Sequence, residues 1–142
     1  MVIAIVRVRG ISGIKPDIVR TMELLKLTRK HHCVLYKDET VTIKSMLNVC
    51  KDYVTWGTIS GETLRSLVEK RGRLPGDKRV PEATVEKAIK AIEAGKNKDT
   101  GIKSVFRLSP PSHGWEPLKD RYPKGALGPR GDEINDLLRR MI

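Results

Sequence analysis

Short apolar segments alternate with amphipathic segments through the first 60 residues of this chain. Residues 2–8, 33–36 and 53–59 are rich in β-branched and aromatic side chains, which is typical of buried strands. Pro16, at the start of one intervening segment, and Thr40, just before the next, are residue types that often begin helices. The alternation predicts an α+β fold, namely a small β-α-β-α-β core with a three-stranded sheet and helices on one face.

Further elements are predicted after this core. Ser60 is a candidate N-cap for a third helix. Residues 70–79 form a turn segment with five cations and one acid, and residues 81–95 follow as an amphipathic helix that needs a surface to lie against. A fourth strand is predicted at residues 102–108 and a last helix at residues 132–141.

We therefore divide the chain into a core at residues 1–60 and an extension at residues 61–142. The extension includes residues 107–131, a stretch of 25 residues with five prolines and four glycines. Ordering it costs roughly 25–50 kcal/mol, whereas burying its large apolar side chains returns about 15 kcal/mol at most. The stretch either stays disordered or becomes ordered by packing on the core together with an external surface. Its Trp, Tyr and Leu residues favour the second alternative.

The charge of the chain predicts a polyanionic partner. Lys and Arg number 28 against 17 Asp and Glu, which gives a net charge of +11 and a pI near 9.9. Nucleic acid is the first candidate and an anionic membrane surface the second. No apolar run approaches the roughly 20 residues of a spanning helix, so no membrane segment is predicted. Cys33 and Cys50 lack the spacing of a disulfide framework or a zinc ribbon, which favours a reducing cytoplasm.

The glycine-rich segment at residues 125–131 (GALGPRG) fails the templates of enzymatic phosphate loops. It matches neither GxxxxGK[ST] nor GxGxxG, and its GXXG match to KH domains follows a proline rather than a helix. Flanked by Lys124 and Arg130, it suits a backbone phosphate or is a simple helix-entry turn. The His-His-Cys run at residues 31–33 alternates between the faces of a strand and cannot converge on one metal ion. No catalytic residue, metal site or cofactor is predicted.

Basic residues occur in clusters without matching acids. Each cation alone is compatible with a solvated surface, but the collective excess supports sequence-independent contacts to phosphates. Because the chain has only one Phe, three Tyr and two Trp, recognition by shape and backbone is expected rather than an extended stacking platform. The predicted RNA-binding residues are Arg7, Arg9, Lys15, Arg29, Lys30, His31, His32, Lys44, Lys51, Arg71, Arg73, Lys78, Arg79, His113, Lys119, Arg121, Lys124 and Arg130.

Four segments of the chain resemble a known family. Residues 3–36 (IAIVRVRGISGIKPDIVRTMELLKLTRKHHCVLY) and 42–59 (TIKSMLNVCKDYVTWGTI) are similar to the large-subunit ribosomal protein family numbered thirty. Residues 106–119 (FRLSPPSHGWEPLK) and 124–142 (KGALGPRGDEINDLLRRMI) resemble its archaeal members and the related eukaryotic protein numbered seven. The last motif is specific because it joins an unusual Gly/Arg loop to a particular helix.

The resemblance implies a structural constituent of the large ribosomal subunit in the cytoplasm, with an archaeal or eukaryotic type of C-terminal extension. It also implies binding to the large rRNA close to 5S rRNA, contacts with neighbouring ribosomal proteins, and no catalysis, cofactor, small-molecule substrate or membrane partner. Residues 38–40, before the second predicted helix, and residues 44–46, within it, differ from the triplets that bacterial relatives have at these positions. The difference bears on the RNA contacts of this second helix. The alternatives are a non-ribosomal RNA-binding or ribosome-assembly accessory protein and, third, a small phosphate-handling enzyme.

Overall fold

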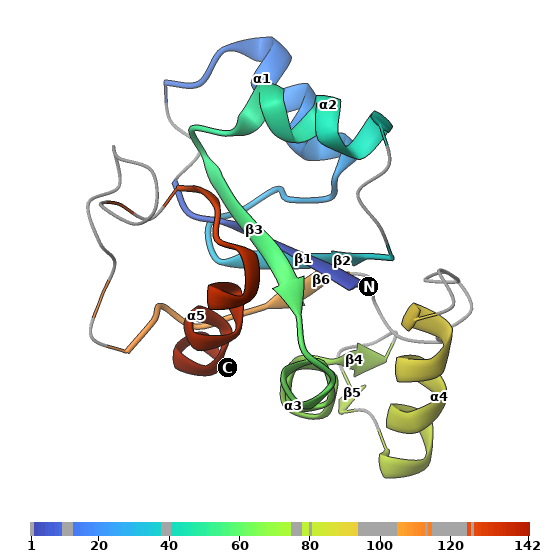
Figure 1. Ribbon diagram of the computed structural model, residues 1–142. Coiled ribbons are helices and arrows are strands. Elements are labelled where there is room, and N and C mark those ends of the chain that lie inside the picture. Colours follow the sequence, from blue (N-terminus) through green and yellow to red (C-terminus); the bar gives the residue numbers. More distant parts are fainter. Residues whose placement is uncertain are drawn as a thin grey trace.

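The structure is a computed structural model that describes residues 2–9, 13–37, 41–74, 78–79, 81–93, 105–112, 114, 125 and 127–142. A five-stranded sheet with the order β6-β2-β1-β3-β7 lies between two layers of helices (Figure 1). The fold is α+β, as the sequence predicts. The strands of this sheet are β1 (Val2–Arg7), β2 (His32–Tyr36), β3 (Val54–Ile59), β6 (Val105–Arg107) and β7 (Gly128–Pro129).

The central strand β1 is buried over its whole length, because its apolar run faces a packed layer on both sides. It pairs antiparallel with β2 and with β3, so that Ile5 lies opposite Val34 on one side and Trp56 on the other. These are the three strands that the alternating pattern predicts, and each bound lies within one residue of its prediction.

The prediction of a three-stranded sheet is wrong in number, because the extension adds a strand at each edge. β6 pairs antiparallel with β2, and β7 pairs parallel with β3. β6 lies within the fourth strand predicted at residues 102–108, whereas β7 has only two residues, too few to show a period of alternating side chains. Pro129 in β7 lies at the edge of the sheet, where a missing N–H costs no ladder hydrogen bond.

The helices α1 (Pro16–Leu24) and α2 (Val41–Cys50) cover one face of the sheet, as expected for the core (Figure 1). Ile3 and Ile5 point to this face. They pack with Met22 and Leu25 from α1 and its following turn, and with Leu47 from α2. The candidate N-cap of α2, Thr40, lies outside the described residues.

The extension supplies the helices that cover the other face: α3 (Gly61–Arg71), α4 (Glu82–Glu93) and α5 (Ile134–Met141). The predicted N-cap of α3 is confirmed, because the hydroxyl oxygen of Ser60 accepts a hydrogen bond from the backbone N–H of Thr63. The apolar stripe of α4, at Val85, Ala88 and Ile92, belongs to the same buried cluster as the side chains of α3. None of the helices in the described part of the chain has the length and apolar character to span a bilayer.

The two ends of the proline- and glycine-rich stretch pack against the domain. After β6, the N–H of Leu108 donates to the carbonyl of His31 at 3.2 Å, and the N–H of Ser109 donates to that of Met141 at 3.1 Å. Leu127 is buried at the other end, and the N–H of Arg130 donates to the carbonyl of Trp56 at 2.8 Å. Both ends of residues 107–131 thus pack on the core, as the second of the two alternatives expects, while residues 113, 115–124 and 126 lie outside the described residues.

Candidate RNA-binding surface

The topology of the sheet brings five strand ends together. β1 ends where β2 and β3 begin, because both neighbours are antiparallel to it. β6 ends and β7 begins at this same end, with His32 opposite Arg107 and Thr55 opposite Gly128. We call this part of the molecule the basic end of the sheet. It is defined by Arg9, Arg29, Lys30, His31, His32, Lys51 and Arg107.

Several cations at the basic end are open to solvent and have no acidic partner among the residues that the structure describes. Arg29 and Lys30 are exposed, and Arg9 and Lys51 are partly exposed. The ion pairs given by the described side chains lie elsewhere, on the helices that cover the other face of the sheet. None of these four cations pairs with a carboxylate in the described part of the chain. Such a set of charges attracts a polyanion.

Arg7 is predicted to bind RNA, but the structure places it beneath this surface. Its side chain is only 3% exposed. Its Nη1 donates to the carbonyl of Leu27 at 2.7 Å, and its Nε donates to the carbonyl of Arg9 at 3.1 Å. Burial lowers the pKa of Arg7 from its usual value. The side chain stays charged, because the pKa of an arginine lies far above neutral pH. The residue thus ties the loop after β1 to the loop after α1, and both loops carry exposed cations.

Arg130 has a similar internal position on the other side of the sheet. It is 6% exposed, and its Nε donates to the hydroxyl oxygen of Thr55 at 2.9 Å. That hydroxyl in turn donates to the carbonyl of Gly128 at 2.8 Å. Arg130 therefore fastens the C-terminal segment to β3, a role that sequence spacing did not reveal.

His31 and His32 lie between the loop after α1 and strand β6, and both are partly buried. Burial lowers the pKa of His32, and the charges of Arg107, Arg29, Arg7 and His31 lower it further. Burial and the charge of Lys30 lower the pKa of His31 in the same direction. Both shifts favour the neutral form of the imidazole at pH 7.

The thiols and acids offer no metal chemistry in the described residues. Cys33 and Cys50 are free and buried, and burial raises the pKa of Cys33 to about 12 and that of Cys50 to about 11. Both are protonated at neutral pH. Within the described ranges, no three His, Cys, Asp or Glu side chains come together in a way that could hold an ion.

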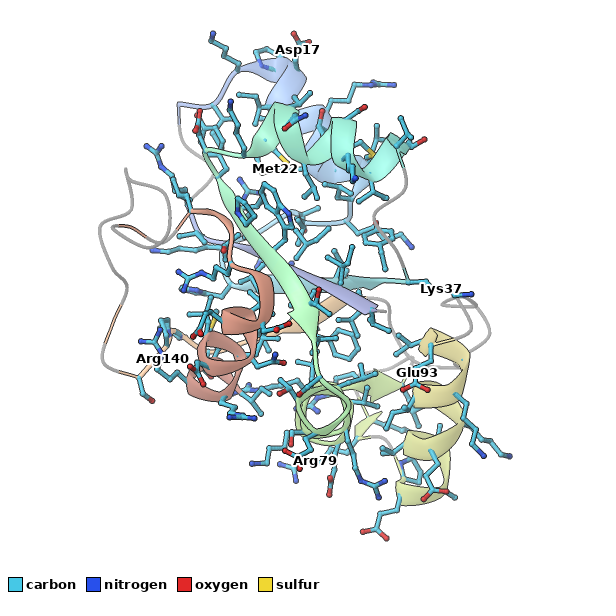
Figure 2. All side chains as sticks on the ribbon, viewed as in Figure 1. Asp17, Met22, Lys37, Arg79, Glu93 and Arg140 are labelled. Atoms are coloured by element: carbon cyan, nitrogen blue, oxygen red, sulfur yellow. The ribbon has the colours of Figure 1, made fainter. Side chains whose placement is uncertain are left out.

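Other predicted cations lie on other elements of the fold. Lys15 precedes α1 and Lys44 lies on α2, both exposed. Arg73 and the exposed Lys78 and Arg79 belong to a separate antiparallel pair, β4 (Arg73–Leu74) with β5 (Lys78–Arg79). Figure 2 shows Arg79 beside α3, on the side of the molecule away from Asp17 of α1.

The predicted set thus divides between at least two surfaces. Arg71 of α3 donates to the hydroxyl of Ser109 at 2.6 Å and so contacts the segment after β6. His113, Lys119, Arg121 and Lys124 lie outside the described residues.

Arg107 at the basic end was not predicted from the sequence. Its place opposite His32 depends on strand pairing across 75 residues of chain, which no local pattern shows.

Comparison with known proteins agrees with the resemblance seen in the sequence. The model of the ribosomal protein L30p/L7e family matches residues 3–54. Large ribosomal subunit protein uL30 of Methanosphaera stadtmanae is 44% identical over 98% of this chain and 99% of its own length. The uL30 proteins of Methanococcus maripaludis and Archaeoglobus fulgidus are 45% and 41% identical, over 100% and 97% of this chain and 100% and 98% of their own lengths. The extension is therefore shared with these archaeal relatives, and the chain belongs to the ribosomal protein L30p/L7e family.

Proposed function

We propose that this protein is a structural, non-catalytic constituent of the large ribosomal subunit and binds rRNA through the basic end of the sheet. The observation that carries the proposal is the gathering of five strand ends, where Arg29, Lys30 and Lys51 have no acidic partner among the described residues. The names of the full-length relatives support the ribosomal assignment. In this role the protein works in the ribosome of the cytoplasm.

The proposed contacts to rRNA phosphates are assigned to cations whose side chains are exposed to solvent. Arg29, Lys30 and Lys51 reach phosphates directly, while Arg7 below them holds the loops in place. Phosphate contacts position a protein on RNA without reading sequence, which suits exposed cations that lie on loops held by hydrogen bonds. The β4–β5 pair, with Lys78 and Arg79, is a second candidate contact on the other side of the molecule. A site close to 5S rRNA and to neighbouring ribosomal proteins is part of this proposal.

An accessory protein that binds RNA during ribosome assembly is the second candidate, because the same cations serve both roles. The two are separated by sedimentation of ribosomal subunits after a high-salt wash. A structural constituent stays with the mature large subunit in stoichiometric amount. An assembly factor is found on precursor particles and is washed from the mature subunit. Recovery of the protein only in the wash would contradict the proposal.

A further inference from the structure

Arg9 lies over an aromatic ring at the basic end. The guanidinium carbon of Arg9 is 5.1 Å from the centroid of the Tyr53 ring, within the range of a cation–π contact. Both residues are partly exposed. Arg9 follows β1 and Tyr53 precedes β3, so the pair joins two of the five strand ends.

Hydrogen bonds hold this pair in place before any ligand arrives. The N–H groups of Val8 and Arg9 donate to the carbonyl of Tyr53 at 2.9 and 3.3 Å. The carbonyl of Arg9 accepts from Arg7 Nε at 3.1 Å, and Arg9 Nη1 donates to the carbonyl of Asp52 at 3.5 Å. Backbone and guanidinium are therefore both positioned, and little side-chain freedom is left to lose on binding.

A contact to phosphate alone does not need this arrangement. A lysine binds a phosphate as a point charge on a mobile chain, and the neighbouring Arg29, Lys30 and Lys51 already supply such charges. A guanidinium lying over a ring is instead a flat cationic surface, of the kind on which unpaired RNA bases stack. Arg9 makes no ion pair with a carboxylate in the described part of the chain, so its charge is available to a ligand.

We propose that the Arg9–Tyr53 pair is a stacking site for one unpaired nucleobase, next to the phosphate contacts of the basic end. This inference rests on the proposed function, because it requires RNA at that surface. It differs from an extended aromatic platform in having one ring and one guanidinium, and it predicts a preference for single-stranded or bulged RNA at this point.

The test uses the full chain and a single-stranded oligoribonucleotide of about ten nucleotides, a length that one such surface can cover. One base is replaced by fluorescent aminopurine, whose emission falls on stacking. A second probe of equal length has the same phosphates but no bases. The variants are Arg9→Lys, which keeps the charge, Tyr53→Phe, which keeps the ring, and Tyr53→Leu, which keeps neither the ring nor the hydroxyl.

We expect wild type and Tyr53→Phe to quench the aminopurine and to prefer the probe that has bases. Arg9→Lys and Tyr53→Leu should bind this probe about 5- to 150-fold more weakly, as for the loss of one stacked base. For Arg9→Lys the salt dependence should be unchanged, because its charge is kept. Circular dichroism verifies that each variant folds. If Tyr53→Leu does not fold, Arg9→Lys alone is enough to test the stacking site.

Equal affinity of wild type and Arg9→Lys, or equal affinity of wild type for both probes, would overturn the stacking site. If binding to both probes is then still steeply salt-dependent, the proposed rRNA-binding function survives while the stacking inference fails. Absence of any binding to either probe or to large-subunit rRNA would remove both.

Discussion

Gly57 of β3 lies where the C-terminal segment crosses the sheet. A Cβ atom at this position would overlap the carbonyl oxygen of Gly131 and would lie 2.9 Å from the Cβ of Ile134. The obstacle is backbone, which cannot rotate away as a long side chain can. We therefore expect Gly57→Ala to lower the free energy of unfolding by about 1–3 kcal/mol, the usual cost of overpacking. Urea denaturation followed by circular dichroism measures this loss.

Gly61→Ala is the matched control. Gly61 is the first residue of α3, and a Cβ there would meet no atom within 4 Å. Alanine favours a helix over glycine, so the control should be neutral or slightly stabilising. An equal loss of stability at both positions would show that close packing does not explain the glycine at position 57.

The pKa of His32 links stability to pH. Burial first, and then the charges of Arg107 and Arg29, hold this pKa below the ordinary 6.5. The unfolded chain thus takes up a proton near that value while the folded chain does not. The free energy of unfolding is expected to fall as the pH decreases from 7 to about 5. His32→Gln should flatten this dependence in thermal unfolding measured across the range, and an unchanged slope would contradict the assignment.

At the scale of elements, α5 shows how a short helix depends on its surroundings. Eight residues are too few for a stable helix in isolation. Ile134, Leu137, Leu138 and Met141 are all fully buried in the cluster that covers the second face of the sheet. The side chain of Asn135 adds a link to β3 by donating to the carbonyl of Thr58 at 3.2 Å. Tertiary packing therefore stabilises this helix.

Leu138→Ala measures that packing. Removing a fully buried leucine side chain costs about 2–5 kcal/mol, depending on how far the neighbours close the cavity. Arg139→Ala on the same helix is the control, because its ion pair with Asp136 at 3.8 Å is solvent-exposed and contributes little. In urea denaturation only the first variant should shift the midpoint clearly. Similar small shifts for both would mean that α5 is not part of the cooperative core.

At the scale of the whole molecule, the net charge of +11 is distributed over more than one surface. Each phosphate contact that is lost reduces the slope of log affinity against log salt by about 0.7–0.9. For the double variant Arg29→Gln/Lys30→Gln we expect a slope for large-subunit rRNA that is smaller by roughly 1.5. Lys87→Gln/Lys90→Gln on the exposed face of α4 removes the same charge elsewhere. Filter binding over a salt series should show no comparable change for this control, and equal changes would indicate general attraction without a defined surface.

The prediction from sequence succeeded where a local pattern carries the information. The apolar run of β1 and the alternation around it predicted three central strands, and the Ser60 cap predicted the start of α3. The excess of cations predicted a polyanionic partner, an expectation that the family agrees with. The helix that begins at Pro16 ends at Leu24, and Lys26 just beyond it adopts a φ of 64°. A single backbone angle of this kind leaves no periodic signal.

Local chemistry alone determined the core elements and the sign of the charge, because periodicity and composition are properties of neighbouring residues. Tertiary structure decided the remainder. It placed β6 and β7 at the edges of the sheet, buried Arg7 and Arg130, and set Arg107 opposite His32. Each of these results depends on contacts between residues that are far apart in the chain. A buried arginine and an exposed arginine look the same in the sequence. Only the packing around each one distinguishes a residue that holds a loop from one that can contact RNA.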